Sequence, residues 1–273
     1  AKLLLDQSPR HAWTAHPKLN PNYAPEEREM FDLGAAAHKL MLGKGAEFVV
    51  VDADDWRTKD AREQRDAARA DGKTPILTAD RNEVVAMVEA GRAQLKAHAA
   101  AKGAFTGGTA ERAITWQEDN GVWCRSLLDY TYPKVALIAD YKTTGGSANP
   151  EVWGNGQLFD RGYDIQAAFH SRGYRKVYGR DPLFRFIVQE NKPPYALSVV
   201  ALTPAALEMA NRKVERAIEL WGQCLKANRW PGYPAQVAYV DPPGWSEKRW
   251  LEREEREIHD KELVGKWLNW QAP

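Results

Sequence analysis

The sequence predicts an α/β fold with a mixed central sheet flanked by helices. Three strand-like runs lie close together between residues 110 and 141, separated only by short turn signals, which indicates an antiparallel meander. Helical patterns precede this meander, and a helix, two strands and a further helix follow it. This order of elements is typical of one α/β domain in which helices cover a sheet.

The elements before the meander are mostly helical. A turn at Asn20-Pro21-Asn22 precedes a helix from about Pro25 to Leu42, which ends at Gly43. The β-branched run at 47–52 predicts a short strand. A charged, Ala-rich helix is expected at 59–70 and a longer helix with an apolar stripe at 80–102.

The meander and the elements after it follow from turn residues and apolar runs. Strands are expected at 110–118, 122–130 and 134–141, with Asn120-Gly121 and Pro133 between them. A helix at 157–174, strands at 183–189 and 195–202, and a helix from Pro204 to about 228 come next. The last part, 246–266, is charged and helical in pattern, with Trp250, Trp267 and Trp270 interleaved. We therefore expect a single domain over 1–240 and a charged, Trp-containing helical tail over 241–273.

Composition limits the possible functions. The chain has 273 residues, with 38 Lys+Arg against 37 Asp+Glu and a net charge of +1, so a uniformly basic DNA coat is excluded but a local basic channel is not. No run approaches the ~18 apolar residues of a membrane span. Two cysteines, Cys124 and Cys224, are too few for a disulfide scaffold or a four-thiolate zinc site. We expect a soluble, cytoplasmic protein.

Carboxylates next to a lysine are the strongest chemical signal. Phosphate-binding loops, nucleophile elbows and HExxH are absent from the sequence. Metal-dependent phosphodiester cleavage needs carboxylates for the metal and a lysine near the attacking water, and Asp/Glu-x-Lys on a strand puts both on one face. Of the three such tripeptides, Asp71-Gly72-Lys73 has a surface-loop context and Glu190-Asn191-Lys192 has the context of a strand exit.

Asp140-Tyr141-Lys142 differs because it ends an apolar run, 135–139, that is typical of a strand buried on both faces. A buried carboxylate there must be paired or bind a cation, since isolated burial costs several kcal/mol. Asp129 lies eleven residues earlier and could face Asp140 across a hairpin at metal-sharing distance. The alternative is that Asp140 forms only a buried ion pair with Arg125 or Lys142.

These residues resemble a known family. Asp129, Asp140-x-Lys142 and a following helix with Gln166 resemble the core of PD-(D/E)XK nucleases, which have a restriction-endonuclease-like fold. More narrowly, four ordered motifs resemble the exodeoxyribonuclease VIII group of phage and prophage recombination exonucleases. They are Gly34-Ala-Ala-Ala-His38, Cys124-Arg-Ser-Leu-Leu-Asp129, Asp140-Tyr-Lys-Thr-Thr144 and Tyr163-Asp-Ile-Gln-Ala-Ala-Phe-His170.

The resemblance implies a role for each matching residue. Asp129, Asp140 and the Tyr141 carbonyl would ligate Mg²⁺, for which Mn²⁺ could substitute, and His38 would complete the metal site. Lys142 would position the attacking water and stabilise charge on the phosphate. For His38, the alternative is a core histidine on a helix packed through small residues.

Further residues belong to the expected site as accessory or catalytic groups. Glu111 matches a glutamate of relatives at the start of the first meander strand, with a surface ion pair as the alternative. Gln166, Tyr163, His170 and Tyr174 share a helix face beside the core stripe, from which they could overlook the carboxylates. The alternative is a merely polar flank. Relatives often have tyrosine at the position of His170, which puts a substrate contact there in doubt.

The stretch 171–180 contains four basic residues, two tyrosines and no acid. It is a candidate DNA contact through Arg172, Arg175, Lys176 and Arg180. An ordinary solvated face is the alternative.

The expected function is therefore a Mg²⁺-dependent exodeoxyribonuclease that degrades linear double-stranded DNA. The resemblance implies 5′-to-3′ degradation that leaves 3′ single-stranded tails for recombination, a ring-shaped homo-oligomer such as a tetramer, and cooperation with a single-strand annealing recombinase. Two alternatives stay open: an endonuclease on the same core, and a DNA-end-binding module that has lost catalysis.

Overall fold

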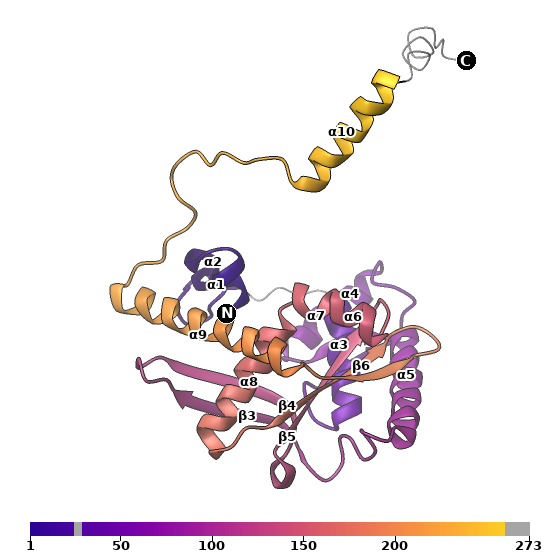
Figure 1. Ribbon diagram of the computed structural model, residues 1–273. Helices are drawn as coiled ribbons and strands as arrows, with labels where there is room; N and C mark the ends of the chain where they lie inside the picture. Colours follow the sequence, from indigo (N-terminus) through magenta and orange to yellow (C-terminus); the bar gives the residue numbers. More distant parts are fainter. Residues whose placement is uncertain (25–28, 260–273) are drawn as a thin grey trace, which may run out of the picture. The chain divides into compact units, whose positions relative to one another are not determined.

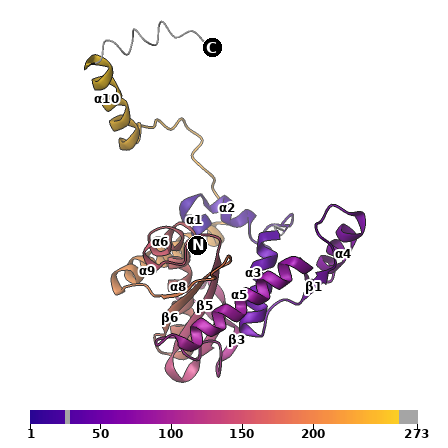
Figure 2. The ribbon, with the colours of Figure 1, turned by 90° about the vertical axis from the view of Figure 1, so that its right-hand side faces the viewer.

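The computed structural model describes residues 1–24 and 29–259, which divide into two units (Figures 1 and 2). The first unit is Ala1–Gly232 and the second is Tyr233–Pro273. The predicted start of a helix at Pro25 and the tail residues 260–266, Trp267 and Trp270 lie outside the described residues. The domain assignment of 1–240 stays a prediction.

A five-stranded sheet forms the centre of the first unit. Its strands follow the order β3 (Thr109–Gln117), β4 (Trp123–Tyr132), β5 (Leu137–Thr144), β6 (Leu183–Glu190) and β7 (Leu197–Val200). The pairs β3–β4, β4–β5 and β6–β7 are antiparallel, whereas β5–β6 is parallel. The parallel pair is possible because the chain crosses over through helices between β5 and β6. The predicted mixed sheet flanked by helices is confirmed.

Helices cover both faces of this sheet (Figures 1 and 2). One face packs against α8 (Tyr163–Tyr178), beyond which lies α9 (Pro204–Ala227), and the other packs against α3 (Glu29–Leu42) and α5 (Thr78–Ala97). Each face buries its own apolar cluster, with Ile138 and Phe186 in the first and Ala139 and Ile187 in the second. The sheet is therefore apolar on both faces, which explains the continuous apolar run at 135–139.

A second, two-stranded sheet was not predicted in full. β1 (Phe48–Val51) pairs in parallel with β2 (Thr74–Leu77), and α4 (Lys59–Ala70) connects them. All four residues of β2 are buried. Pro75 removes a ladder donor from this short strand, and such a proline argues against a strand when only the sequence is read.

Three predicted boundaries differ because of local backbone conformation. The helix expected at 157–174 is divided into α7 (Gln157–Asp160) and α8, since Gly162 between them is left-handed, with φ of 71°. The strand expected from residue 134 begins at Leu137, since Pro133–Val135 form a 3-10 turn and Ala136 is also left-handed. The strand expected at 195–202 is limited to β7. The remaining helices are α1 (Lys2–Asp6), α2 (Pro9–Thr14) and α6 (Pro150–Asn155).

The second unit contains α10 (Gly244–His259), and the preceding residues 233–243 form neither helix nor strand. Its surface is charged, with an ion pair of 2.7 Å between Arg253 and Glu257 one turn apart. Trp245 and Trp250 are exposed, and each has an arginine side chain over its ring. Within 1–24 and 29–259, every helix is too short or too polar to span a membrane.

One buried amide braces the sheet against α5. Gln189 on β6 is fully buried, and its amide nitrogen donates to the Met87 carbonyl over 2.7 Å. Its amide oxygen accepts a hydrogen bond of 2.7 Å from the Tyr141 hydroxyl. Space for this side chain exists because α5 has a glycine, Gly91, where a Cβ would lie 2.5 Å from the Gln189 amide oxygen.

We predict that Gly91→Ala lowers the free energy of unfolding by about 1–3 kcal/mol, because the added methyl group collides with a buried side chain that is hydrogen-bonded on both sides. Gly154→Ala in α6 is the matched control, since a Cβ there meets nothing within 4 Å. It should stabilise the helix by about 0.5–1 kcal/mol. Urea denaturation measures both, and an unchanged midpoint for Gly91→Ala would contradict the close packing.

Candidate active site

Three acidic residues, Glu111, Asp129 and Asp140, occupy neighbouring register positions where the β4–β5 pairing stops. The β4–β5 ladder ends at the pair Tyr130–Ala139, so Asp129 and Asp140 come next in register, just beyond the last paired residues. On the other side of β4, the pairs Ala110–Tyr130 and Arg112–Leu128 place Glu111 opposite Asp129. The predicted approach of Asp129 and Asp140 across a hairpin therefore agrees with the register of the sheet.

Side-chain alternation along β4 changes at Asp129. In a regular strand, residues two positions apart point to the same face of the sheet. Cys124 and Leu128 pack in the cluster beneath α8, but Tyr130, two residues after Leu128, packs in the cluster beneath α3 and α5 on the other face. Glu111 has a left-handed backbone with φ of 50°, which is uncommon for a residue with a side chain and concentrates at functional sites. These two local departures from regular strand geometry lie side by side at the carboxylates.

His38 is held between two of the carboxylates. Its Nε2 lies 2.9 Å from Asp129 Oδ2, and its Nδ1 lies 3.2 Å from Glu111 Oε1. Helix α3 brings it there by burying Ala36 and Ala37 completely. Ligand atoms of His38, Glu111 and Asp129 all lie within 4.8 Å of one another. His38 is thus part of the polar site and not an isolated core histidine.

Asp140 and Lys142 form a buried ion pair of 2.5 Å. Their side chains are 1% and 16% exposed, which leaves only the lysine accessible from the adjoining cavity. Gln166 of α8 donates its amide to the other oxygen of Asp140 over 3.3 Å. The ion pair expected as an alternative is therefore present, but it belongs to a cluster that contains every predicted catalytic group.

The electrostatics of the two aspartates differ. Burial and the nearby charge of Asp129 raise the pKa of Asp140 to about 7, despite the attraction of Lys142. Asp129 is buried too, but the hydrogen bond from His38, the charge of Lys142 and the Tyr141 N–H together lower its pKa. For Lys142, burial opposes the charged form, yet Asp140 and Asp129 raise its pKa above the ordinary value. Lys142 is accordingly an ammonium at neutral pH.

A buried hydrogen-bond chain orients Gln166. Its amide nitrogen lies 3.2 Å from His170 Nε2, and His170 Nδ1 lies 2.5 Å from Ser126 Oγ on β4. Burial lowers the pKa of His170 to about 4, so this imidazole is neutral at pH 7. Because Nε2 then accepts from the amide, Nδ1–H donates to Ser126, and the Gln166 nitrogen stays directed at Asp140.

The three tyrosines of the predicted site have different positions. The Tyr163 ring lies 5.1 Å from the Lys142 ammonium and stacks on Trp153, so it touches the site as predicted. The Tyr141 side chain is buried and its N–H donates to Asp129, while metal binding by its carbonyl stays a prediction. Tyr174 is buried in the apolar cluster and does not overlook the carboxylates.

The basic stretch after His170 has acidic partners from other parts of the fold. The sequence segment 171–180 lacks acids, but the turn between β3 and β4 supplies them: Arg172 forms two hydrogen bonds of 2.8 Å to buried Glu118, and Lys176 lies 2.9 Å from Asp119. Arg172 and Lys176 are thus paired with acidic side chains of the fold, and DNA contact by them stays a prediction. Arg175 pairs with exposed Asp181, and Arg180 donates to the Pro133 carbonyl. DNA contact by these two stays a prediction.

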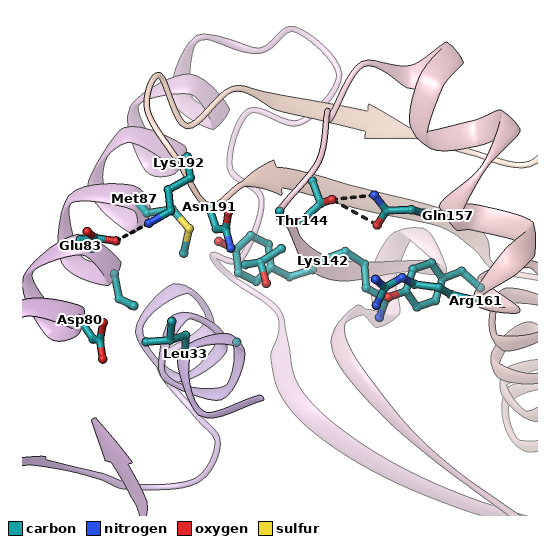
Figure 3. Close-up of a pocket in the computed structure, with 16 residues that line it drawn as sticks. Leu33, Asp80, Glu83, Met87, Lys142, Thr144, Gln157, Arg161, Asn191 and Lys192 are labelled. Carbon is teal, nitrogen blue, oxygen red and sulfur yellow. Dashed lines mark hydrogen bonds and ion pairs between the residues drawn. The ribbon is translucent and has the colours of Figure 1, made fainter. Parts of the chain in front are cut away.

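A cavity of about 350 Å³ opens beside Lys142 (Figure 3). Thr144 and Gln157 are hydrogen-bonded to each other at one side, next to Arg161, and Glu83 pairs with Lys192 over 3.0 Å at the other. Sequence analysis missed Gln157, Arg161 and Asn191 as cavity residues. The motif Asp140-Tyr-Lys-Thr-Thr144 offered the one available signal, because Thr144 follows Lys142 on the same face of the strand.

The two other tripeptides lie outside the carboxylate cluster. Asp71 and Lys73 form an exposed pair with each other, as the surface interpretation predicted. Glu190 accepts a hydrogen bond of 2.9 Å from the Ala148 N–H, and Lys192 pairs with Glu83.

Comparison with known proteins agrees with this geometry. Residues 4–243 match a family model described as a PDDEXK-like domain of unknown function (DUF3799). The chain belongs to this family. It therefore has the PD-(D/E)XK nuclease fold that the motifs indicated, with the carboxylate–lysine cluster at the sheet. Nucleases of this superfamily generally use divalent metal ions.

A crystal structure with the same fold comes from Eubacterium rectale, where the protein is named "Putative exonuclease". The similarity has a TM-score of 0.53 and covers 86% of this chain and 88% of the other, with 14% sequence identity. At this identity the likeness concerns the fold. No protein of curated function matches the chain.

We predict that stability falls as the pH decreases from 6.5 to 4, with a contribution of about 2 kcal/mol lost by pH 5 from His170 alone. The unfolded chain takes up a proton near pH 6.5, whereas the buried folded imidazole resists protonation until about pH 4. His170→Gln keeps an acceptor for Gln166 but does not titrate. Thermal unfolding of both proteins at pH 7.5 and pH 5 measures the difference, and equal pH dependence would contradict a neutral buried histidine.

Proposed function

We propose that this protein is a Mg²⁺-dependent exodeoxyribonuclease that degrades linear double-stranded DNA. The observation that carries the proposal is the convergence of His38, Asp129, Asp140 and Lys142 from one helix and two strands within a chain of the PDDEXK-like family. Carboxylate oxygens beside one imidazole suit Mg²⁺ or Mn²⁺. DNA is the phosphodiester substrate to which the motif resemblance points.

The donor set fits a hard divalent cation. Asp129 and Asp140 would hold it from the opened β4–β5 edge, with His38 and the Tyr141 carbonyl completing the site. Glu111 shares its cluster with His38 and Asp129 and is a further candidate ligand. When bound, the metal supplies Lewis acidity toward a phosphate oxygen and lowers the pKa of a water.

Lys142 has the properties of a fixed cation and not of a general base. Its raised pKa keeps it protonated, and the pair with Asp140 holds its ammonium at the wall of the cavity. In that position it orients the attacking water and stabilises negative charge that develops on the phosphate. Gln166 assists indirectly: it donates to Asp140 and so fixes that carboxylate without adding charge.

The exonuclease assignment depends on the motifs. The four ordered motifs resemble the exodeoxyribonuclease VIII group, and a structure of the same fold is named an exonuclease. Degradation from 5′ ends, 3′ single-stranded tails, a homo-oligomeric ring and cooperation with a single-strand annealing recombinase extend the same resemblance. The intact Asp129, Asp140 and Lys142 oppose a module without catalysis.

We predict that Asp140→Asn and Lys142→Ala each reduce the Mg²⁺-dependent cleavage rate by at least about a hundredfold. Asp140→Asn keeps the side-chain shape but removes the charge, and Lys142→Ala removes the ammonium. Glu190→Gln is the matched control, because its amide oxygen can still accept from the Ala148 N–H. Release of label from end-labelled duplex measures the rates; near wild-type activity of folded Asp140→Asn would exclude this site.

We also predict that linear duplex is degraded with Mg²⁺ or Mn²⁺, while covalently closed circular duplex is spared. Ca²⁺ should support DNA binding with little turnover, because its larger radius and looser coordination align water and phosphate poorly. Gel analysis of both substrates with each ion provides the measurement. Efficient cutting of closed circles would identify an endonuclease, and activity in excess EDTA would exclude metal dependence.

A further inference from the structure

A second hollow, which we call the α9 groove, has a basic rim and an apolar floor. It measures about 530 Å³ and lies between α1, α7, the first turn of α8 and α9. Its rim contains four cationic side chains and one acidic one: Lys2, Arg212, Lys213, Arg216 and Asp6. Its floor contains four apolar side chains: Leu5, Phe159, Ile165 and Met209. Helices α1 and α9 lie against each other (Figure 1).

The rim cations differ in how firmly the fold holds them. Lys213 lies 2.7 Å from fully buried Asp164, so this pair ties α9 to α8. Arg216 has only an exposed partner, Glu219, and such surface pairs contribute little. Arg212 is exposed and has no ion-pair partner among residues 1–24 and 29–259. Two guanidinium groups on successive turns of α9 are thus available for an anionic ligand.

The α9 groove adjoins the cavity at Lys142. The short helix α7 separates the two hollows: Phe159 lines the groove, while Gln157 and Arg161 line the cavity. Lys2 lies over the α7–α8 junction, where a Cβ on Gly162 would be 2.7 Å from its side chain. Cationic side chains therefore continue from the groove rim over the junction to Arg161 and Lys142, although Lys2 at the junction is paired with Asp6.

We propose that the α9 groove binds single-stranded DNA, as the strand that enters or leaves the Lys142 cavity; this inference rests on the nuclease function proposed above. Arginines on the rim contact phosphates, and the apolar floor contacts base faces. A duplex keeps its bases stacked and surrounded by phosphates, so only an unpaired strand can use both features. The groove supplies Arg212, which has no ion-pair partner among the described residues, and Arg216, whose partner is exposed. By contrast, buried Glu118 holds Arg172, and Asp119 pairs with Lys176.

The test measures single-strand binding in EDTA, where cleavage does not interfere. The full chain is titrated into a fluorescein-labelled oligo-dT of twelve nucleotides, and anisotropy is recorded over a series of salt concentrations. The double variant Arg212→Glu, Arg216→Glu should bind more weakly, and the slope of log K against log[salt] should decrease by about 1.4, or about 0.7 for each lost phosphate contact. Met209→Ser should weaken binding with an unchanged slope, because it removes apolar contact only.

The matched control is Lys226→Glu with Arg229→Glu. Both residues are exposed: Lys226 lies in the last turn of α9, about 15 Å along the helix from the groove, and Arg229 follows the end of the helix. The change in net charge is the same. This variant should bind like the wild type. Unfolding midpoints of all variants show whether the fold persists.

The outcomes separate this inference from the proposed function. Single-strand binding that the double reversal leaves unchanged, or that is no tighter than binding of a matched duplex, would overturn the groove even if Mg²⁺-dependent cleavage is observed. Strand binding that depends on Arg212 and Arg216 in a protein without cleavage activity would support the groove and reject the nuclease function.

Discussion

The buried Asp140–Lys142 pair is the constraint on which the rest of the site depends. Removing two charges from water costs several kcal/mol for each ion, and their mutual attraction offsets this only with good geometry and further hydrogen bonds. Asp129 increases the cost of keeping Asp140 charged, because a second carboxylate repels Asp140 and raises its pKa. The surrounding elements stabilise the two carboxylates with hydrogen bonds. Helix α3 brings His38 to Asp129, α8 brings Gln166 to Asp140, and the Tyr141 N–H donates to Asp129.

The same constraint explains the irregular sheet around the site. In a continuous ladder, the Tyr141 N–H would pair with the β4 backbone, whereas here it donates to the Asp129 carboxylate. Pairing of β4 with β5 instead stops at Tyr130–Ala139, and the alternation of β4 changes face at the next residue. The strained backbone of Glu111 belongs to the same place. Such irregularity persists because two large apolar clusters and the Gln189 brace hold the sheet on both faces.

The positions and partners of the cationic side chains are more informative than the net charge of the chain. The net charge of +1 does not show that α8 carries three cations, two of which, Arg172 and Lys176, pair with acidic residues of the β3–β4 turn. Three cations near the cavity, Arg212 and Arg216 in the first half of α9 and Arg161 after α7, are not held by a buried acidic partner among the described residues. Both positions adjoin the hollow at Lys142, where an electrostatic attraction for phosphate would be useful.

The sequence by itself determined the α/β class and the presence of all five strands of the central sheet, and it predicted Asp129, Asp140 and Lys142 as the core of the site. The sequence could predict Asp129, Asp140 and Lys142 because an apolar run with charged residues at its end indicates a buried strand. The alternation of side chains along that strand places Lys142 on the same face as Asp140. The helix face with Gln166 and His170 followed from helical periodicity in the same way.

Only the tertiary structure decided what depends on partners distant in the sequence. His38 meets Asp129 across 91 residues, and Arg172 meets Glu118 across 54, in both cases because separate elements pack together. Local sequence patterns do not indicate which residues from distant parts of the chain come into contact. The sequence for this reason did not indicate acidic partners for the stretch 171–180, and it overlooked β2. The proline of β2 is tolerated because, in the described part of the chain, β2 pairs with β1 alone, so one side of this strand needs no ladder donor. The groove on α9 likewise exists only where α1, α7, the first turn of α8 and α9 come together, since its cations and its apolar floor lie on separate elements of the chain.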